Sequence, residues 1–244
     1  MKHIDKRVAL VTGANKGIGH EVARGLASSG MIVLLGARSA ELGVTAATAL
    51  KSQGLDVRFI EIDVVRPATL AAAAKRIGAE FGRLDVLVNN AGISDAHDGA
   101  PSVATLDAVR RIFDVNFFGA LGATQAMLPL LRNSSAARVV NMSSELGSLT
   151  MNADPTWQYA PYKRLGYNAS KAALNMLTIQ LAAELRDSGI KVNAVNPGFT
   201  ATDLNQHRGT QTIAEGAAAA LHYALIGDDG VTGGFFGADG LVAW

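Results

Sequence analysis

The sequence predicts an α/β fold, in which one doubly wound domain has helices on both faces of a seven-stranded parallel sheet. Short apolar runs, typical of buried parallel strands, alternate with helical patterns along the whole chain. No linker, charge block or change of composition interrupts this alternation, so we expect residues 1–244 to form a single domain. Hydrophobic residues make up 49% of the chain and aromatic residues only 6%, which favours an Ala/Val/Leu-packed α/β core over an aromatic-rich β-sandwich.

The expected strands are runs of Val, Ile and Leu that are short enough to cross one sheet. They are Val8–Val11, Met31–Leu35, Val57–Ile62, Leu84–Val88, Arg138–Met142 and Lys191–Val195, with a seventh near Gly234–Gly237.

The expected helices lie between these strands and have recognisable ends. Pro67 suits a first helical turn, and Gly30, Gly54, Gly82 and Gly189 suit helix ends. The helices cover about Gly17–Ser28, Ala40–Gln53, Pro67–Phe81, Val103–Arg132, Tyr167–Asp187 and Gln211–Ile226.

Composition argues against several classes of function. The net charge of +1 offers no basis for binding nucleic acid or an anionic membrane. The chain has no cysteine, and its five histidines show no zinc-site spacing, so we expect no metal site. Residues 1–7 resemble neither a signal peptide nor a membrane span, and we expect a cytoplasmic protein.

A glycine-rich loop follows the first expected strand and opens a helix. Glycine lets the backbone turn sharply and approach a pyrophosphate, whose charge the helix N-terminus stabilises. The spacing Gly-x-x-x-Gly-x-Gly differs from the Gly-x-Gly-x-x-Gly fingerprint, but the position suits a Rossmann-type dinucleotide site. The residues expected to bind the cofactor here are Gly13, Asn15, Lys16, Gly17, Ile18 and Gly19.

Two cations indicate which dinucleotide binds. An acidic residue after the second strand would hold the ribose hydroxyls, but this chain has Arg38 there and Lys16 in the glycine loop. Both could meet a 2′-phosphate, which favours NADPH/NADP+ over NADH, although two solvated surface cations are the alternative. Later strand ends add Asp63 and Val64, placed for the adenine or as a helix cap before Pro67, and then Asn90, Ala91 and Gly92.

Tyr167 and Lys171 stand four residues apart at the start of an expected helix, so they share one helical face. An ammonium beside a phenol favours the phenolate, so we expect the pKa of Tyr167 to fall toward neutral pH. Such a tyrosine can give a proton to a developing alkoxide.

Taken together, these motifs resemble the short-chain dehydrogenase/reductase family over nearly the whole chain. The ordered set is Thr12-Gly13…Gly17-Ile18-Gly19, Asn89-Asn90-Ala91-Gly92, Asn116, Ser144, Tyr167…Lys171 and Asn196-Pro197-Gly198. The resemblance is strongest to NADPH-dependent carbonyl reductases. It implies a catalytic tetrad of Asn116, Ser144, Tyr167 and Lys171, in which Tyr167 and Lys171 also contact the cofactor. It further implies cofactor contacts from Pro197, Gly198, Phe199, Thr200 and Thr202.

The distance from Ser144 to Tyr167 is longer than is usual in the family, and a second pair, Tyr159 and Lys163, lies nearer the usual distance. Pro161 falls inside that pair and would remove a hydrogen bond from a continuing helix, so we favour Tyr167. The extra residues form an insertion at about 149–164, whose aromatic residues either wall a substrate pocket or pack the loop. Because the insertion is short, the chain could be a monomer or a homo-oligomer.

The expected reaction is hydride transfer from NADPH to a small-molecule ketone, aldehyde or quinone carbonyl, with Tyr167 as general acid. The polar stretch at about 201–212 could form a lid. Because fold alone does not prove turnover, a non-catalytic NADPH-binding sensor or scaffold remains the alternative.

Overall fold

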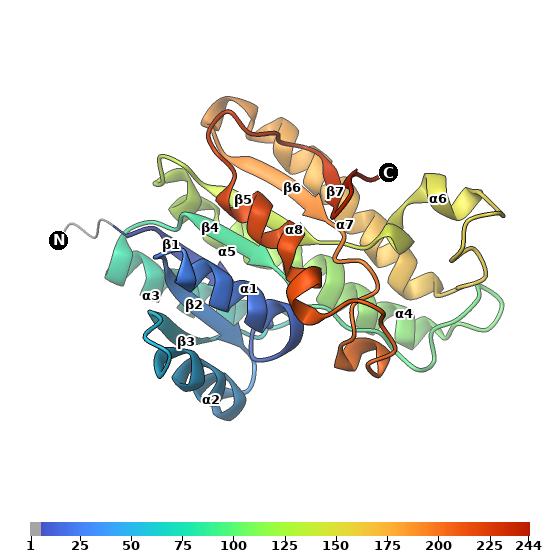
Figure 1. Ribbon diagram of the computed structural model, residues 1–244, viewed down its shortest axis with the longest axis horizontal. Coiled ribbons are helices and arrows are strands. Elements are labelled where there is room, and N and C mark those ends of the chain that lie inside the picture. Colours follow the sequence, from blue (N-terminus) through green and yellow to red (C-terminus); the bar gives the residue numbers. More distant parts are fainter. Residues whose placement is uncertain (1–5) are drawn as a thin grey trace.

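The computed structural model describes residues 6–244 and contains one eight-stranded sheet in the order β3-β2-β1-β4-β5-β6-β7-β8 (Figure 1). The first seven strands are parallel, as expected, and the short β8 pairs antiparallel with β7. The strands are β1 Val8–Val11, β2 Ile32–Ala37, β3 Val57–Glu61, β4 Val86–Asn89, β5 Arg138–Met142, β6 Lys191–Val195, β7 Phe235–Gly237 and β8 Gly240–Leu241.

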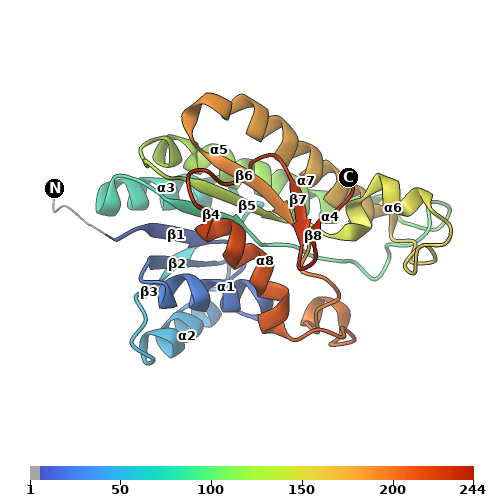
Figure 2. The same cartoon turned by 45° about the horizontal axis from the view of Figure 1, so that its top comes forward.

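Helices cover both faces of the sheet, which confirms the doubly wound architecture (Figures 1 and 2). The helices are α1 Gly17–Ser28, α2 Ala40–Lys51, α3 Pro67–Phe81, α4 Leu106–Phe113, α5 Gly119–Arg132, α6 Leu149–Ala153, α7 Leu165–Glu184 and α8 Ile213–Leu225. Side chains alternate along each strand, so Ala9 and Val11 pack toward α1, α2 and α8, whereas Val8 and Leu10 pack toward α3, α5 and α7. Two apolar cores result, one on each face.

The helix expected over 103–132 is not continuous. It begins at Leu106, because the Thr105 hydroxyl accepts a hydrogen bond from the Ala108 backbone N–H at 3.3 Å and caps the helix. A π-helical turn at Asp114–Phe118 then separates α4 from α5. Such turns insert an extra residue and are frequent at functional sites. This turn carries Asn116, whose role is described below.

Chain order reverses beside β1, which has β2 on one side and β4 on the other. In open α/β sheets, ligands bind at such a switch point, beyond the carboxyl ends of the strands. The fold therefore brings the loops after β1, β4, β5 and β6 to one edge.

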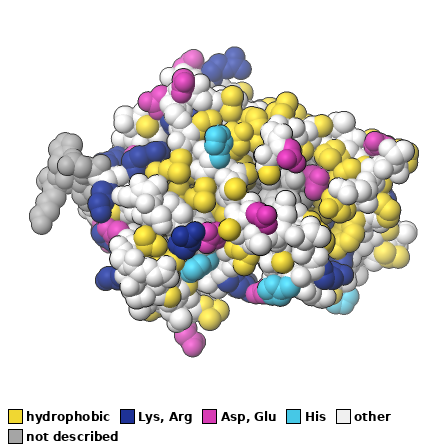
Figure 3. All heavy atoms as spheres, in the orientation of Figure 1, with side chains coloured by type: hydrophobic (Ala, Val, Ile, Leu, Met, Phe, Trp, Pro, Cys, Tyr) yellow, Lys and Arg dark blue, Asp and Glu magenta, His cyan; other side chains and the backbone are white. Residues whose placement is uncertain are grey.

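Three observations concern other kinds of partner. No helix within residues 6–244 combines the length and apolar character needed to cross a membrane. In the same residues, no group of three His, Asp or Glu side chains could hold a metal ion. On the face shown in Figure 3, basic and acidic side chains are interspersed.

Candidate active site

A cleft of about 530 Å³ opens at the carboxyl ends of β1 and β4. It brings together residues that lie as far apart in the sequence as Gly13 and Ile213. Most of the residues expected to bind a cofactor line it: Gly13, Asn15, Lys16, Gly17, Ile18, Gly19, Arg38, Asp63, Val64, Asn90, Ala91, Gly92, Tyr167, Lys171, Pro197 and Thr202.

The glycine loop after β1 has the geometry that only glycine adopts readily. Gly13 has φ +62° and Gly17 has φ +59°, both in the left-handed region. A Cβ on Gly13 would also approach the Cα of Ala91 to 2.9 Å. Asn90 holds the loop in place, because its side-chain amide donates hydrogen bonds to the carbonyls of Thr12 at 2.9 Å and Gly13 at 3.1 Å.

Arg38 follows β2, and Asp63 and Val64 follow β3, so these lining residues lie on the opposite side of β1 from β5. Asp63 also organises its own turn, since its Oδ1 accepts a hydrogen bond from the Val65 N–H at 3.2 Å. The interpretation of Asp63 as a helix cap is wrong, because Arg66 is the N-cap residue of α3 and no side chain caps that helix; Asp63 does line the cleft.

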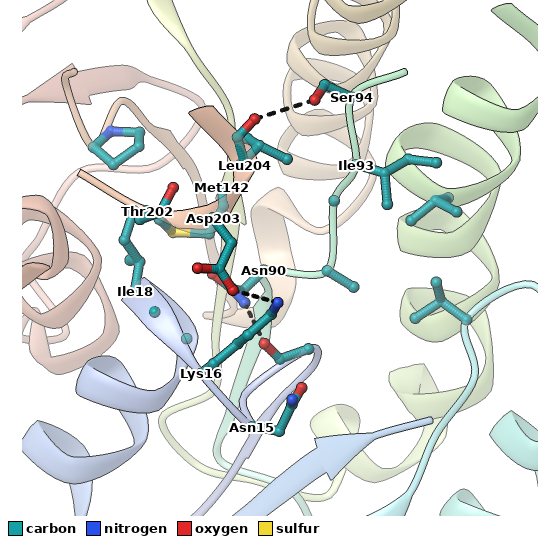
Figure 4. A pocket seen from close by; sticks show the side chains of 18 of the residues that line it. Asn15, Lys16, Ile18, Asn90, Ile93, Ser94, Met142, Thr202, Asp203 and Leu204 are labelled. Atoms are coloured by element: carbon teal, nitrogen blue, oxygen red, sulfur yellow. Dashed lines mark hydrogen bonds and ion pairs between the residues drawn. The ribbon is translucent and has the colours of Figure 1, made fainter. Parts of the chain in front are cut away.

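The segment after β6 contacts the glycine loop through a pair of residues that no sequence pattern indicates. Lys16 Nζ forms an ion pair with Asp203 at 2.5 Å, and Ser94 Oγ donates to the Leu204 carbonyl at 3.2 Å (Figure 4). His207 also contacts Asp203, with 2.7 Å between Nε2 and Oδ1. Lys16 and His207 together lower the pKa of the Asp203 carboxyl. Residues of segment 201–212 therefore line part of the cleft.

Ser144, Tyr167 and Lys171 come together where β5 ends and α7 begins. The Ser144 and Tyr167 side chains hydrogen-bond each other, and the Lys171 ammonium lies 5.5 Å from the centroid of the Tyr167 ring. Lys171 Nζ donates to the Met142 carbonyl at 2.7 Å, at the end of β5. A proton donor, a hydroxyl partner and a buried cation thus lie close together, and Tyr167 and Lys171 line the cleft.

The expected fall in the pKa of Tyr167 is wrong. Burial raises the pKa of Tyr167 to about 12, and the hydrogen bond with Ser144 offsets only part of that rise. Burial also lowers the pKa of Lys171 to about 8. Desolvation disfavours the charged form of each group, and the sequence could not show how deeply either one is buried. Tyr167 is therefore protonated at neutral pH and can act directly as an acid.

Asn116 connects the π-helical turn to the loop after β4 and to α7. Its Oδ1 accepts from the Ile93 N–H at 2.8 Å, and its Nδ2 donates to the Ile93 carbonyl at 3.1 Å and to Ser170 Oγ at 3.0 Å. The side chain is buried and fully engaged. Asn116 thereby links the backbone next to Gly92 to Ser170, which lies three residues after Tyr167 on α7.

Asp98 is a site residue that the sequence analysis missed. The residue is only 7% exposed, and its carboxylate accepts hydrogen bonds from the backbone N–H groups of Gly166 at 2.8 Å and Tyr167 at 3.0 Å. These N–H groups lie in the first turn of α7, where backbone donors have no partner within the helix itself. The contact spans 69 residues, so no local pattern could reveal it. Asp98 holds in place the turn that presents Tyr167.

Replacing Asp98 tests this anchoring. We expect Asp98→Ala to lower the free energy of unfolding by about 1–3 kcal/mol, because one buried and one partly buried N–H group lose their partner. We also expect kcat to fall more than the affinity for the cofactor. Chemical denaturation and steady-state kinetics measure both effects. Asp107→Ala, at an exposed position on α4, is the matched control, and an Asp98→Ala protein with unchanged stability would contradict this role.

The competing pair, Tyr159 and Lys163, lies outside any helix, because α7 begins at Leu165. Neither residue lines the cleft. The insertion instead contains α6 and a series of turns, in which the Tyr159 ring contacts Trp157 and Phe199.

Three residues expected to contact the cofactor do not line the cleft. Gly198 has φ +69° and lies against the Gln211 side chain. The Phe199 ring faces Tyr159, and Thr200 is buried, with its hydroxyl donating to the Pro197 carbonyl at 2.9 Å. These residues shape the loop that carries Pro197 and Thr202, both of which do line the cleft.

The chain is similar to known dehydrogenases and reductases. A family model described as short chain dehydrogenase matches residues 7–212. Short-chain dehydrogenase/reductase 1 of Saponaria officinalis is 33% identical, with 91% of this chain and 90% of that protein covered. (+)-Neomenthol dehydrogenase of Capsicum annuum is 29% identical, with 96% of each covered. The structure of NADPH-bound carbonyl reductase from chicken fatty liver superposes with a TM-score of 0.84 at 29% identity, covering 99% of this chain and 100% of that one.

Proposed function

The chain belongs to the short-chain dehydrogenase family of oxidoreductases, and we propose that it is an NADPH-dependent reductase that converts a ketone, aldehyde or quinone carbonyl to the alcohol. One observation carries the proposal. A single cleft is lined by Lys16 and Arg38, which follow β1 and β2, and by Tyr167 and Lys171 of α7, where Lys171 reaches the end of β5. The first pair suits a phosphate and the second pair suits proton transfer to oxygen.

The cleft has room for a dinucleotide along its length. A Cβ on Gly17 would meet only Thr202 Cγ2, at 3.8 Å, so the loop is open on that side. A Cβ on Gly92 would project to within 3.6 Å of Lys171 Nζ and 3.5 Å of Asn116 Oδ1, so this glycine leaves space beside the ammonium. The similar carbonyl reductase from chicken fatty liver was solved with NADPH bound, which supports the same cofactor here.

Arg38 and Lys16 would hold the 2′-phosphate that distinguishes NADPH from NADH. Arg can contact it with two parallel hydrogen bonds, whereas Lys acts as a point charge. The backbone N–H groups at the start of α1 would face the pyrophosphate. NADPH, when bound, supplies the hydride.

Arg38→Asp tests this assignment. We expect the ratio of kcat/KM for NADPH over NADH to fall by about 10–100-fold, since a charge-assisted hydrogen bond contributes about 1.5–3 kcal/mol. The same substitution at the exposed Arg110 on α4 changes net charge equally and serves as the control. An unchanged coenzyme ratio in Arg38→Asp would remove Arg38 from the phosphate site.

Tyr167 donates its proton to the carbonyl oxygen as negative charge develops there. Its raised pKa keeps the phenol protonated at neutral pH, so its proton is available for transfer. Ser144, already hydrogen-bonded to the phenol, would also bond the carbonyl oxygen and hold it in line. Lys171 adds positive charge beside the forming phenolate and, with Asn116, would support reprotonation of Tyr167.

Two further proposals concern the setting of the reaction. Segment 201–212 would act as a lid that releases the glycine loop when the Lys16–Asp203 ion pair opens. We also propose a cytoplasmic location, where NADPH is the usual reductant, and a small-molecule substrate with no nucleic acid or membrane partner.

The loss of NADPH absorbance with a panel of ketones, aldehydes and quinones tests the proposed function. We expect reduction of at least one class, with NADPH preferred over NADH. Cofactor binding without turnover of any panel member would favour a non-catalytic sensor or scaffold instead.

A further inference from the structure

Asp203 is an acidic residue paired with a cation that the proposed phosphate site would use. Its Oδ2 lies 2.5 Å from Lys16 Nζ, and the two side chains point toward each other (Figure 4). Both residues line the cleft. The Lys16 side chain is 64% exposed and that of Asp203 53%, so water screens the pair and the attraction between them is weak. Lys16 can therefore change its partner readily.

Arg38, the other cation assigned to the 2′-phosphate, is in a different state. It is exposed and lines the same cleft. Within residues 6–244, its guanidinium has neither an ion-pair partner nor a hydrogen-bond partner. The two cations are thus not equally available, because Arg38 can meet a phosphate directly, whereas Lys16 must first leave Asp203.

The turn that carries Asp203 has hydrogen bonds of its own that do not involve Lys16. The Thr202 N–H donates to Asn205 Oδ1 at 3.2 Å, and the His207 N–H donates to the Thr202 carbonyl at 2.8 Å. His207 Nε2 also lies 2.7 Å from Asp203 Oδ1, and it is the donor there, because an ionised carboxylate only accepts. Asp203 therefore keeps one partner when Lys16 leaves, and the turn keeps its internal bonds.

A phosphate monoester carries a charge of about −1.5 to −2 at pH 7, more than one carboxylate, whereas the ribose hydroxyls of NADH carry none. Only the phosphorylated cofactor can therefore draw Lys16 away from a carboxylate. We propose that Asp203 is a specificity-determining residue that competes with the 2′-phosphate for Lys16. The competition limits the affinity for NADPH and NADP+ and leaves that for NADH and NAD+ unaffected. The inference rests on the proposed phosphate site, since it gives Lys16 a phosphate to bind.

Binding of NADP+ and NAD+ tests the competition, because the two differ only in the 2′-phosphate. Calorimetry without a carbonyl substrate measures the Kd of each for the natural protein and for Asp203→Asn. We expect Asp203→Asn to bind NADP+ about 3–10-fold more tightly, because Lys16 is then free and a charge that repels phosphate is gone. The Kd of NAD+ should stay within about twofold of its natural value, since no phosphate contests Lys16.

The effect should depend on Lys16. In a Lys16→Ala protein, the further change Asp203→Asn should alter the Kd of NADP+ by less than about twofold, because no cation is left to compete for. Asp107→Asn is the matched control. It also removes the acid of an exposed ion pair, the one with Arg110 on α4, and should leave both Kd values unchanged.

Unchanged or weaker binding of NADP+ by Asp203→Asn would overturn the inference. So would equal tightening of NADP+ and NAD+, or tightening that persists in Lys16→Ala, because either result indicates a general effect of charge. Equal affinity of the natural protein for NADP+ and NAD+ would contradict the proposed phosphate site and this inference with it. The expected Kd changes, without reduction of any carbonyl compound by NADPH, would support the role of Asp203 and count against the proposed reaction alone.

Discussion

Tyr167→Phe should lower kcat by at least about 100-fold, because positioned acid catalysis contributes about 10²–10⁴-fold. The substitution removes one oxygen, the one that hydrogen-bonds Ser144 and would protonate the carbonyl oxygen. The phenyl ring still fills its place beside Lys171, so we expect the affinity for NADPH to change little. Stopped-flow absorbance of NADPH under single-turnover conditions measures the chemical step directly.

Tyr162→Phe is the control for Tyr167→Phe. Tyr162 lies in the insertion, its side chain is exposed, and its ring contacts Arg164. This variant should retain nearly all activity. If Tyr167→Phe also retained most of its activity, another group would have to supply the proton, and the tetrad would lose its central member.

Removal of the buried ammonium should have an effect of similar size. We expect Lys171→Ala to reduce kcat/KM by about 10²–10³-fold, the range for loss of one preorganised group that stabilises charge in the transition state. The variant loses both the bond to the Met142 carbonyl and the positive charge near Tyr167. Lys163→Ala, outside the cleft, is the control, and circular dichroism would show that both variants fold. Near-natural kcat/KM in Lys171→Ala would contradict this role.

The pH profile gives a second measure of Lys171. Its pKa is lowered to about 8, so the side chain is charged below that pH and neutral above it. If the charge is needed, kcat/KM for reduction is full below about pH 8 and declines as the pH rises through it. Lys171→Arg stays charged and should remove this decline. A profile that is flat to pH 10 in the natural protein would show that the charge of Lys171 is not required.

The sequence predicted most of the fold because buried parallel strands are almost continuously apolar. Val8–Val11, Arg138–Met142 and Lys191–Val195 are strands with the expected ends, and Pro67 and Gly82 bound α3 as expected. The expected ends of a helix are wrong where the local sequence pattern does not determine them, as in the helix expected over 103–132. Within the π-helical turn at Asp114–Phe118, Asn116 contacts Ile93 and Ser170, which are distant in the sequence.

The site was predictable to the extent that motifs mark it. The glycine loop, Arg38, Tyr167 and Lys171 were found from spacing, and they line one cleft. The contact between Lys16 and Asp203 spans 187 residues and was invisible in the sequence. The pKa of Tyr167 was mispredicted because the sequence shows the neighbouring ammonium but not the burial that outweighs it.

The most direct test of the central claim follows the hydride itself. Reduction of a carbonyl substrate with [4,4-²H₂]NADPH should yield an alcohol that carries one deuterium on the former carbonyl carbon, which mass spectrometry detects. Oxidation of the deuterated cofactor with an alcohol that contains no deuterium, or with no alcohol at all, would contradict hydride transfer in this cleft.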